Sequence, residues 1–156
     1  MKIKTKPYGE IEVNEKQKIH FPDGLFGFEE VKNYYLLDSK EGPFYWLQSA
    51  EHPDLAFVLI DPRVFKENYT LNLRDEDYRA IEARKSDARK GDVIDFTIVT
   101  VPEDPEKISA NLMGPIIINR KSRKARQAIS ENDEYTVKHY IMEEMKGRKE
   151  DLVETA

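Results

Sequence analysis

Residues 108 to 119 read Ile-Ser-Ala-Asn-Leu-Met-Gly-Pro-Ile-Ile-Ile-Asn, and they carry the clearest alternating pattern in the chain. Alternation with a period of two is typical of a β-strand that has one face in a core. Pro115 cannot donate to a sheet ladder, so this strand either lies at an edge or breaks at Gly114-Pro115. We expect the core face to consist of Ile108, Ala110, Leu112, Ile116 and Ile118.

The opposite face of this segment is a candidate docking surface. It presents Asn111, Met113 and Ile117. A flexible methionine suits contacts with more than one partner, and a free strand edge can pair with a partner's backbone. We therefore expect these three residues, together with Phe26, to lie on or near a partner surface. An alternative stays open, in which this face packs under a helix.

Outward from this segment, most of the chain also has the pattern of short strands. An opening hairpin is expected around Pro7-Tyr8-Gly9, whose proline and glycine suit a tight turn. Residues 55–60 are apolar on both faces, as in a fully buried strand. The other strand candidates are residues 19–21, 33–38, 44–48, 94–99 and 135–141.

Two segments read as short helices. Residues 74–84 begin with three acidic side chains, which favour a helix N-terminus. From Ser122 onward, Ala125, Ala128 and Ile129 have helical spacing, and we expect Ala125 and Ile129 to face the core. Residues 87–92 read as a polar loop.

Roughly nine strand candidates and two short helices, without a βαβ rhythm, predict a mainly β fold. We expect an antiparallel barrel or sandwich with short helical insertions. No internal repeat or linker is present, so residues 1–145 are expected to form a single domain. Residues 146–156 read as a charged, flexible tail.

The composition favours a cytoplasmic protein without affinity for membranes. The 156-residue chain carries a net charge of −5, which opposes general binding to nucleic acid or anionic lipid. It has no cysteine, which excludes disulfides and thiolate chemistry and fits a reducing compartment. The longest apolar run, residues 55–60, is far shorter than the ~20 residues that a membrane helix needs. The N-terminus has no signal-peptide core.

The sequence predicts no catalytic, metal or cofactor site. Its three histidines, His20, His52 and His139, are not at metal-ligand spacing from one another, and no phosphate-binding or dinucleotide motif is present. Acidic pairs are frequent, but solvated turns explain most of them. One alternative is a small hydrolase or isomerase that uses an aspartate and a histidine.

A basic run offers a second alternative function. Residues Arg120 to Arg126 include five basic side chains in seven positions and could bind RNA phosphates directly. No aromatic residues are interleaved for base stacking. We favour the interpretation that this run is the solvated face of a short helix.

Three blocks of sequence carry a family resemblance. They are Phe21-Pro-Asp-Gly-Leu-Phe-Gly-Phe-Glu29; Leu47-Gln-Ser with Leu55-Ala-Phe57 and Asp61-Pro62; and Val99-Thr-Val-Pro-Glu-Asp-Pro105 running into residues 108–119, with Arg123, Ala125 and Gln127 beyond. In order and spacing the chain closely resembles the family of flagellar assembly factor FliW. Residues 65–92 and the charged tail match only weakly.

The resemblance implies a partly open β-barrel, a monomer, and neither cofactor nor catalysis. It also implies two protein partners. Proteins of this kind bind the translational repressor CsrA and block its action on flagellin message, and they bind flagellin itself. An acidic adaptor suits a basic RNA-binding partner through electrostatic complementarity. Residues of this sequence that would contact either partner do not follow from the resemblance.

Overall fold

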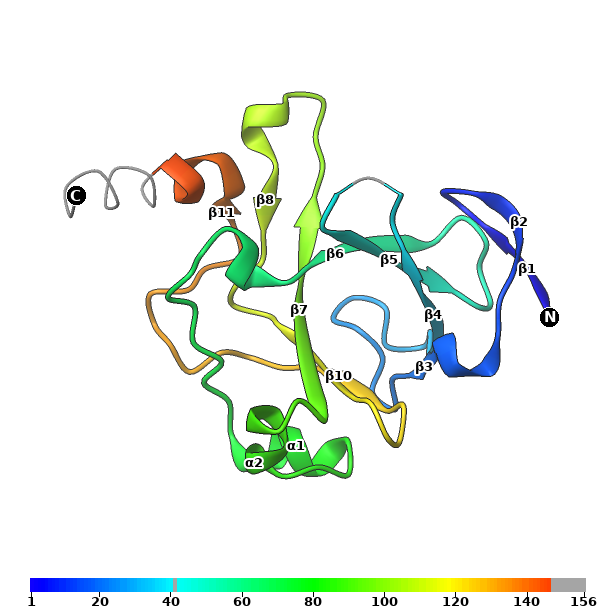
Figure 1. Ribbon diagram of the computed structural model, residues 1–156, viewed down its shortest axis with the longest axis horizontal. Helices are drawn as coiled ribbons and strands as arrows, with labels where there is room; N and C mark the ends of the chain where they lie inside the picture. Colours follow the sequence, from blue (N-terminus) through cyan, green and yellow to red (C-terminus); the bar gives the residue numbers. More distant parts are fainter. Residues whose placement is uncertain (41, 147–156) are drawn as a thin grey trace.

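A curved antiparallel sheet forms the body of the protein (Figure 1), and the computed structural model describes residues 1–40 and 42–146. Its strands follow the order β10-β9-β7-β6-β5-β4-β3, and β8 and β11 extend it beside β7. The sheet strands are β3 (Lys18–His20), β4 (Asn33–Asp38), β5 (Phe44–Ser49), β6 (Ala56–Ile60), β7 (Val93–Thr100), β8 (Ser109–Ala110), β9 (Ile116–Asn119), β10 (Ala125–Gln127) and β11 (His139–Tyr140).

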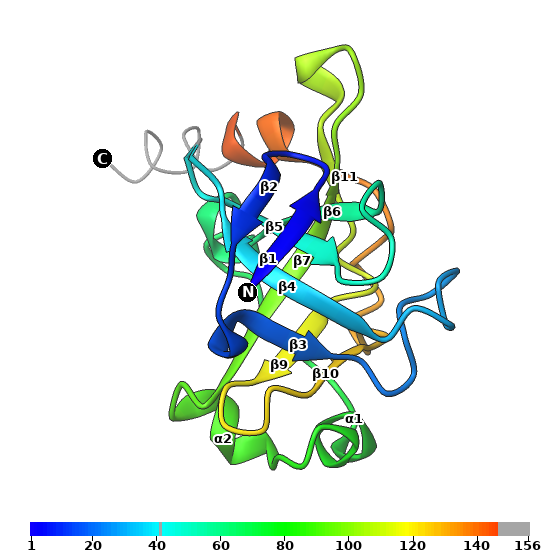
Figure 2. The same ribbon diagram turned by 90° about the vertical axis from the view of Figure 1, so that its right-hand side faces the viewer.

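The remaining elements lie around this sheet. The predicted opening hairpin is confirmed as a separate two-stranded sheet, which Figure 2 shows in front of β4 and β5. It consists of β1 (Lys2–Thr5) and β2 (Gly9–Glu12). The helical elements are the α-helices α1 (Asp75–Ala80) and α2 (Lys85–Arg89) and the 3-10 turns η1 (Glu15–Gln17), η2 (Pro62–Val64) and η3 (Pro105–Lys107).

The two edge strands of the sheet nearly meet. His20 at the end of β3 forms a single parallel bridge with Lys124, and the His20 N–H donates to the Arg123 carbonyl at 3.0 Å. One bridge does not make a ladder, so the barrel is only partly closed. This confirms the mainly β, partly open barrel that the sequence and the resemblance predict.

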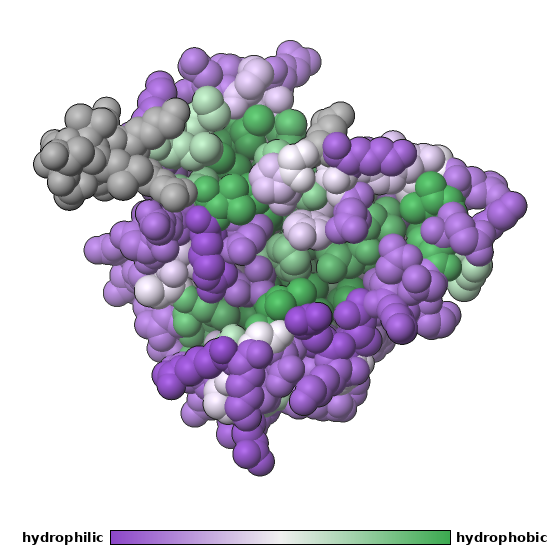
Figure 3. Space-filling model, in the orientation of Figure 1, coloured by the Kyte–Doolittle hydropathy of each residue, from purple (hydrophilic) through white to green (hydrophobic). Residues whose placement is uncertain are grey.

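The concave side of the sheet holds the main core. The strands β3, β4, β5, β6, β7, β9 and β10 contribute eight buried residues: Ile19, Tyr34, Leu47, Leu59, Phe96, Ile116, Ile118 and Ala125. The loop between β3 and β4 adds Phe21, Leu25 and Val31. Since the barrel is open, six further apolar residues of this cluster stay partly exposed. Figure 3 shows apolar side chains gathered in the hollowed middle of one face, over β5 to β7, within a hydrophilic surround.

The convex side of the sheet is covered as well, by loops and by the two short helices. Its residues form three smaller clusters, one of which packs Ile117 of β9 against Tyr78 and Ile81 at α1. A second packs Ile60 and Val99 under the loops around Phe65 and Tyr135, and the third packs β4 under the opening hairpin. Both faces of the sheet are therefore buried over much of their area.

The segment 108–119 breaks where its Gly-Pro pair predicts, and the break exchanges the two faces. Val99 of β7 pairs with Ala110, and Phe96, three residues before Val99, pairs with Ile116. Ile116 lies six residues after Ala110, where a regular antiparallel ladder would place its partner only three residues after it. Three extra residues therefore loop out, and an odd number turns every later side chain to the opposite face. Ala110 and Leu112 lie in a convex cluster, while Ile116 and Ile118 lie in the concave core.

The predicted helix after Ser122 is wrong. Residues Ala125–Gln127 form β10, which pairs with Ile116–Ile118 of β9, and Ile129 is 42% exposed instead of facing the core. Cross-strand pairing with β9 outweighs the weak helical spacing of a few alanines. The helix predicted at residues 74–84 is confined to α1, whereas α2 begins just after that stretch, at Lys85, and extends into the predicted loop at residues 87–92.

The last predicted strand is shorter than expected, because only His139–Tyr140 pair with β8. Residues 141–146 are helical. The expected flexible tail, residues 146–156, lies outside the described residues except for Lys146. Within residues 1–40 and 42–146, no helix is long and apolar enough to cross a membrane.

Candidate functional site

A buried glutamine joins the two loops that carry the exposed candidate residues. The Phe26 N–H donates to Oε1 of Gln127 at 2.9 Å, and Nε2 of Gln127 donates to the Gly114 carbonyl at 3.0 Å. Gln127 is only 7% exposed and sits at the end of β10. Its one amide group therefore ties the loop that contains Phe26 to residues 111–115, although these loops are far apart in sequence.

Residues 111–115 are held firmly by backbone contacts. Oδ1 of Asn111 accepts from the Gly114 N–H at 2.9 Å, and the N–H groups of Leu112 and Met113 both donate to the Thr136 carbonyl at 3.1 Å. The Met113 carbonyl accepts from the Ser130 N–H at 2.8 Å. The backbone at Met113 is thus fixed, while its side chain points outward.

Three apolar side chains beside these contacts are exposed. Phe26 is 51% exposed, Met113 41% and Ile129 42%. Ile129 belongs with the other two because its neighbour Ser130 donates to Met113. We name these three residues the Phe26–Met113 surface. Exposed apolar side chains on rigid loops, with a hydrogen-bonded backbone beneath them, are typical of a protein-docking surface.

The expected site residues have different outcomes. Phe26 and Met113 are exposed, and Gln127 and Gly114 bring their loops together. Asn111 is half-buried, and its side chain holds the loop at Gly114. The expectation that Ile117 is exposed on a partner surface is wrong, since it is completely buried under α1. The alternative that this face packs under a helix holds at Ile117.

Sequence reasoning did not assign a site role to Gln127 or Ile129. Gln127 does stand in the third family block, but its role depends on contacts with residues 13 and 101 positions away. Ile129 was expected in the core because the segment around it read as a helix. Neither role could be read from local spacing.

Gln127→Ala should lower the free energy of unfolding by about 1–3 kcal/mol, because the buried Gly114 carbonyl would lose its hydrogen-bond donor. The loop at Phe26 should loosen at the same time. Chemical denaturation measures the first effect, and hydrogen exchange at the Phe26 amide measures the second. An unchanged unfolding free energy together with unchanged Phe26 exchange would contradict the linking role of Gln127.

Two of the three histidines, His139 and His20, form side-chain hydrogen bonds within the protein. Nε2 of His139 accepts from the Thr136 N–H at 2.9 Å, so Nδ1 carries the proton that bonds Oε1 of Glu144 at 3.0 Å. Burial raises the pKa of Glu144, but hydrogen bonds from His139 and Lys66 outweigh it and leave the pKa below its usual value. His20 bonds Asn33 and is exposed.

Within the residues that the structure describes, no observation indicates that a histidine binds a substrate or a metal ion. The described linings of the pockets at Arg123 and at Met1 include no histidine. In the described part of the chain, no three histidine, aspartate or glutamate side chains gather in a way that could hold a metal ion. The Asp/His alternative therefore has no geometric support in this part of the chain.

The basic run 120–126 spans the turn between β9 and β10 and the first two residues of β10. Three of its five cations are neutralised. Their ion pairs join Arg126 to Asp77 and Asp23, Lys124 to Glu82, and Lys121 to Asp92, with N–O distances of 2.9, 2.8, 2.6 and 3.5 Å. Asp77 is completely buried, so Arg126 anchors the turn to α1 instead of facing solvent. The interpretation of this run as the solvated face of a short helix is therefore wrong, because its last two residues lie in a strand and Arg126 is paired with a buried carboxylate.

Comparison with known proteins finds similarity over almost the whole chain. The model of the FliW protein family matches residues 2–141. The chain belongs to the FliW family. The expected resemblance is thereby confirmed, and the match includes both loops of the Phe26–Met113 surface.

Individual FliW proteins are similar over nearly their full lengths. The flagellar assembly factor FliW of Thermoanaerobacter pseudethanolicus is 45% identical over 149 residues, which cover 94% of this chain and 97% of that protein. The flagellar assembly factor FliW of Treponema denticola is 43% identical over 145 residues, covering 93% and 96%. A crystal structure of the flagellar assembly factor FliW superimposes with a TM-score of 0.81 at 37% identity and covers 90% of this chain and 96% of that one.

Proposed function

We propose that this FliW-family protein is a flagellar assembly factor that acts by binding other proteins. It sequesters the translational repressor CsrA and also binds flagellin, and so couples the flagellin level to flagellin translation. The observation that carries this proposal is the near full-length similarity, at 45% identity, to a protein named flagellar assembly factor FliW. The Phe26–Met113 surface supports it, because exposed apolar anchors suit protein partners.

The regulation follows from mass action. Two ligands that exclude each other on one adaptor make the free concentration of the first depend on the concentration of the second. When flagellin accumulates, it occupies the adaptor and releases CsrA, which then represses flagellin synthesis. The adaptor needs neither catalysis nor a cofactor for this exchange.

The negative net charge of the chain supports the proposal that one partner is a basic protein. Its net charge is −5, so it attracts a positively charged RNA-binding protein and steers the two together. We propose that the adaptor works as a cytoplasmic monomer and that the Phe26–Met113 surface contacts one or both partners. Phe26 and Met113 supply large apolar contacts there. The side chain of Asn111 stabilises the Met113 loop by accepting a hydrogen bond from the Gly114 N–H.

Met113→Asp should weaken binding of CsrA or flagellin at least tenfold, since a carboxylate would be desolvated in an apolar contact. Phe26→Asp should have the same effect. Both side chains are exposed, so the thermal melting temperature should stay nearly unchanged. Titration calorimetry with CsrA, followed by displacement with flagellin, measures the effect.

The matched control is Val101→Asp, another charge placed at an exposed apolar residue. Val101 is 58% exposed and follows β7, in the loop that projects away from the Phe26 loop in Figures 1 and 2. It should leave both affinities intact. Folded Met113 and Phe26 variants that keep full affinity for both partners would rule out this surface. If the unaltered protein binds neither partner at micromolar concentration, the proposed function itself fails.

A further inference from the structure

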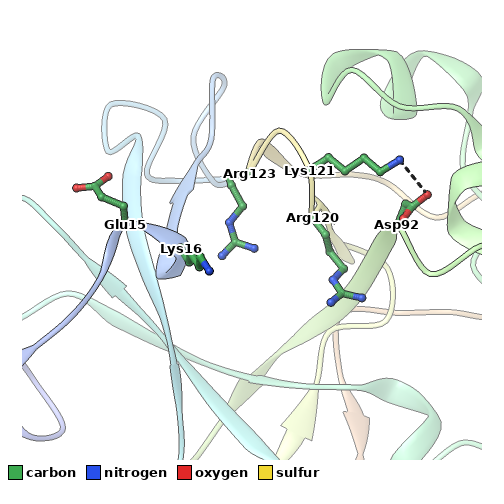
Figure 4. A pocket seen from close by; sticks show the side chains of 6 residues that line it. All are labelled: Glu15, Lys16, Asp92, Arg120, Lys121 and Arg123. Carbon is green, nitrogen blue, oxygen red and sulfur yellow. Dashed lines mark ion pairs between the residues drawn. The ribbon is translucent and has the colours of Figure 1, made fainter.

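An open pocket lies beside the seam where β3 and β10 nearly meet. Its volume is about 640 Å³, and six residues line it: Glu15, Lys16, Asp92, Arg120, Lys121 and Arg123. Figure 4 shows that they come from three separate parts of the chain, namely η1, the start of β7 and the turn between β9 and β10. Four of the six are cationic, in a protein whose net charge is negative.

The two acidic residues neutralise little of this charge. Asp92 pairs with Lys121 at 3.5 Å, and the carboxylate of Glu15 points away from the basic side chains in Figure 4. Among the described residues, Lys16, Arg120 and Arg123 form no ion pair. The pocket therefore holds three positive charges without a neutralising partner.

Arg123 is the most constrained of these cations. Its Nε is buried and has no hydrogen-bond partner among the described residues. Burial, reinforced by the positive charge of Arg120, holds the pKa of Arg123 below its usual value. An anion in the pocket would relieve the repulsion between the guanidinium groups of Arg120 and Arg123.

The backbone that carries these side chains is rigid before any ligand arrives. Oδ1 of Asn119 accepts from the N–H groups of Lys121 and Ser122, and its Nδ2 donates to the Ile81 carbonyl at 2.8 Å. Arg123 is held at a positive φ of 62°, a conformation that only a few per cent of non-glycine residues adopt. On the other side, a capping box of Asn14 and Gln17 fixes the turn that bears Lys16.

We propose that this pocket binds a small, multiply charged anion through its phosphate groups. Two guanidinium groups on one fixed turn suit phosphate oxygens because each presents a planar fork of donors. Three unneutralised cations match a ligand with more than one negative charge. The proposal does not depend on CsrA or flagellin, since the pocket shares no residue with the Phe26–Met113 surface.

A small anion fits better than an RNA strand. None of the six lining residues is aromatic, so bases would have nothing on which to stack. The neighbouring cations Lys124 and Arg126 are already paired with carboxylates and do not extend the basic surface. The lining thus offers a local charge cluster instead of a track for a phosphodiester backbone.

Pyrophosphate at constant ionic strength is the probe, and binding is followed by titration calorimetry and by the rise in melting temperature. The double variant Arg120→Gln/Arg123→Gln should lose at least tenfold in affinity. Lys16→Gln should weaken binding severalfold, and it provides a test on an exposed residue whose change does not threaten folding. Arg79→Gln, an exposed arginine on α1, is the matched control and should bind as the unaltered protein does.

Either of two kinds of result would overturn the proposal. One is the absence of pyrophosphate binding at millimolar concentration, or equal binding by Lys16→Gln and the unaltered protein. The other is binding of a single-stranded RNA oligonucleotide, lost in the Lys16 variant, without binding of pyrophosphate. That second result would assign the pocket to RNA.

Discussion

Ile117→Ala is expected to lower the free energy of unfolding by about 2–5 kcal/mol. The side chain is completely buried between β9 and the α1 region, where it contacts a cluster that includes Tyr78 and Ile81. Truncation removes buried apolar area and leaves a cavity that a well-packed cluster fills only in part. Chemical denaturation of the variant measures the loss.

The matched control for this prediction is Met113→Ala. The two positions are four residues apart, and alternation alone assigns them to the same face. Because Met113 is 41% exposed, its truncation should change the unfolding free energy by no more than about 0.5 kcal/mol. If Ile117→Ala instead left stability intact and reduced partner binding, Ile117 would belong to the docking surface and the burial would be wrong.

Gly24→Ala is expected to lower the free energy of unfolding by a similar amount, about 2–5 kcal/mol. Gly24 has a positive φ of 67°, and a Cβ there would lie 2.5 Å from the Cα of Glu29, which is backbone and cannot rotate away. Left-handed strain contributes roughly 1–2 kcal/mol and overpacking roughly 1–3 kcal/mol. The adjacent Leu25 is fully buried in the concave core, so a shifted loop also disturbs that core.

Gly27→Ala is the matched control within the same loop. Gly27 also has a positive φ, of 86°, but a Cβ there meets nothing within 4 Å. Its substitution should cost only the conformational penalty of about 1 kcal/mol. Urea denaturation of both variants separates steric clash from backbone preference. Equal losses would show that the contact with Glu29 contributes nothing.

The Gly24 variant also tests how the proposed docking surface is built. Phe26 lies two residues beyond Gly24, and its N–H depends on Gln127 for a partner. A displaced loop should therefore weaken partner binding even where the variant remains folded.

Much of the fold could be predicted from local pattern. The opening hairpin, the strands around residues 33–38, 44–48 and 55–60, and the break at Gly114-Pro115 all follow from alternation, turn residues and a missing donor. The family could be recognised for a similar reason, because its motifs are contiguous. These features depend on neighbours in sequence and not on distant contacts.

The candidate site could be predicted only in part. Phe26 and Met113 were expected at a partner surface, but the link between their loops is Gln127, which no local pattern marks. The pocket at Arg123 likewise needs η1 and the β9–β10 turn to meet. The basic run 120–126 was visible in the sequence. Which of its cations are neutralised depends on carboxylates that are distant in sequence, such as Asp77 and Glu82.

By itself, the sequence determined which residues of segment 108–119 are apolar, that they form strands, and that the strands break at Gly114-Pro115. Only the tertiary structure decided which face each residue occupies. Three residues loop out of the ladder and exchange the faces, and loops and short helices cover part of the convex side. Ile117 lies in β9 beneath α1 and is core, whereas Met113 lies in the looped-out stretch, where no element covers its side chain fully, and is surface.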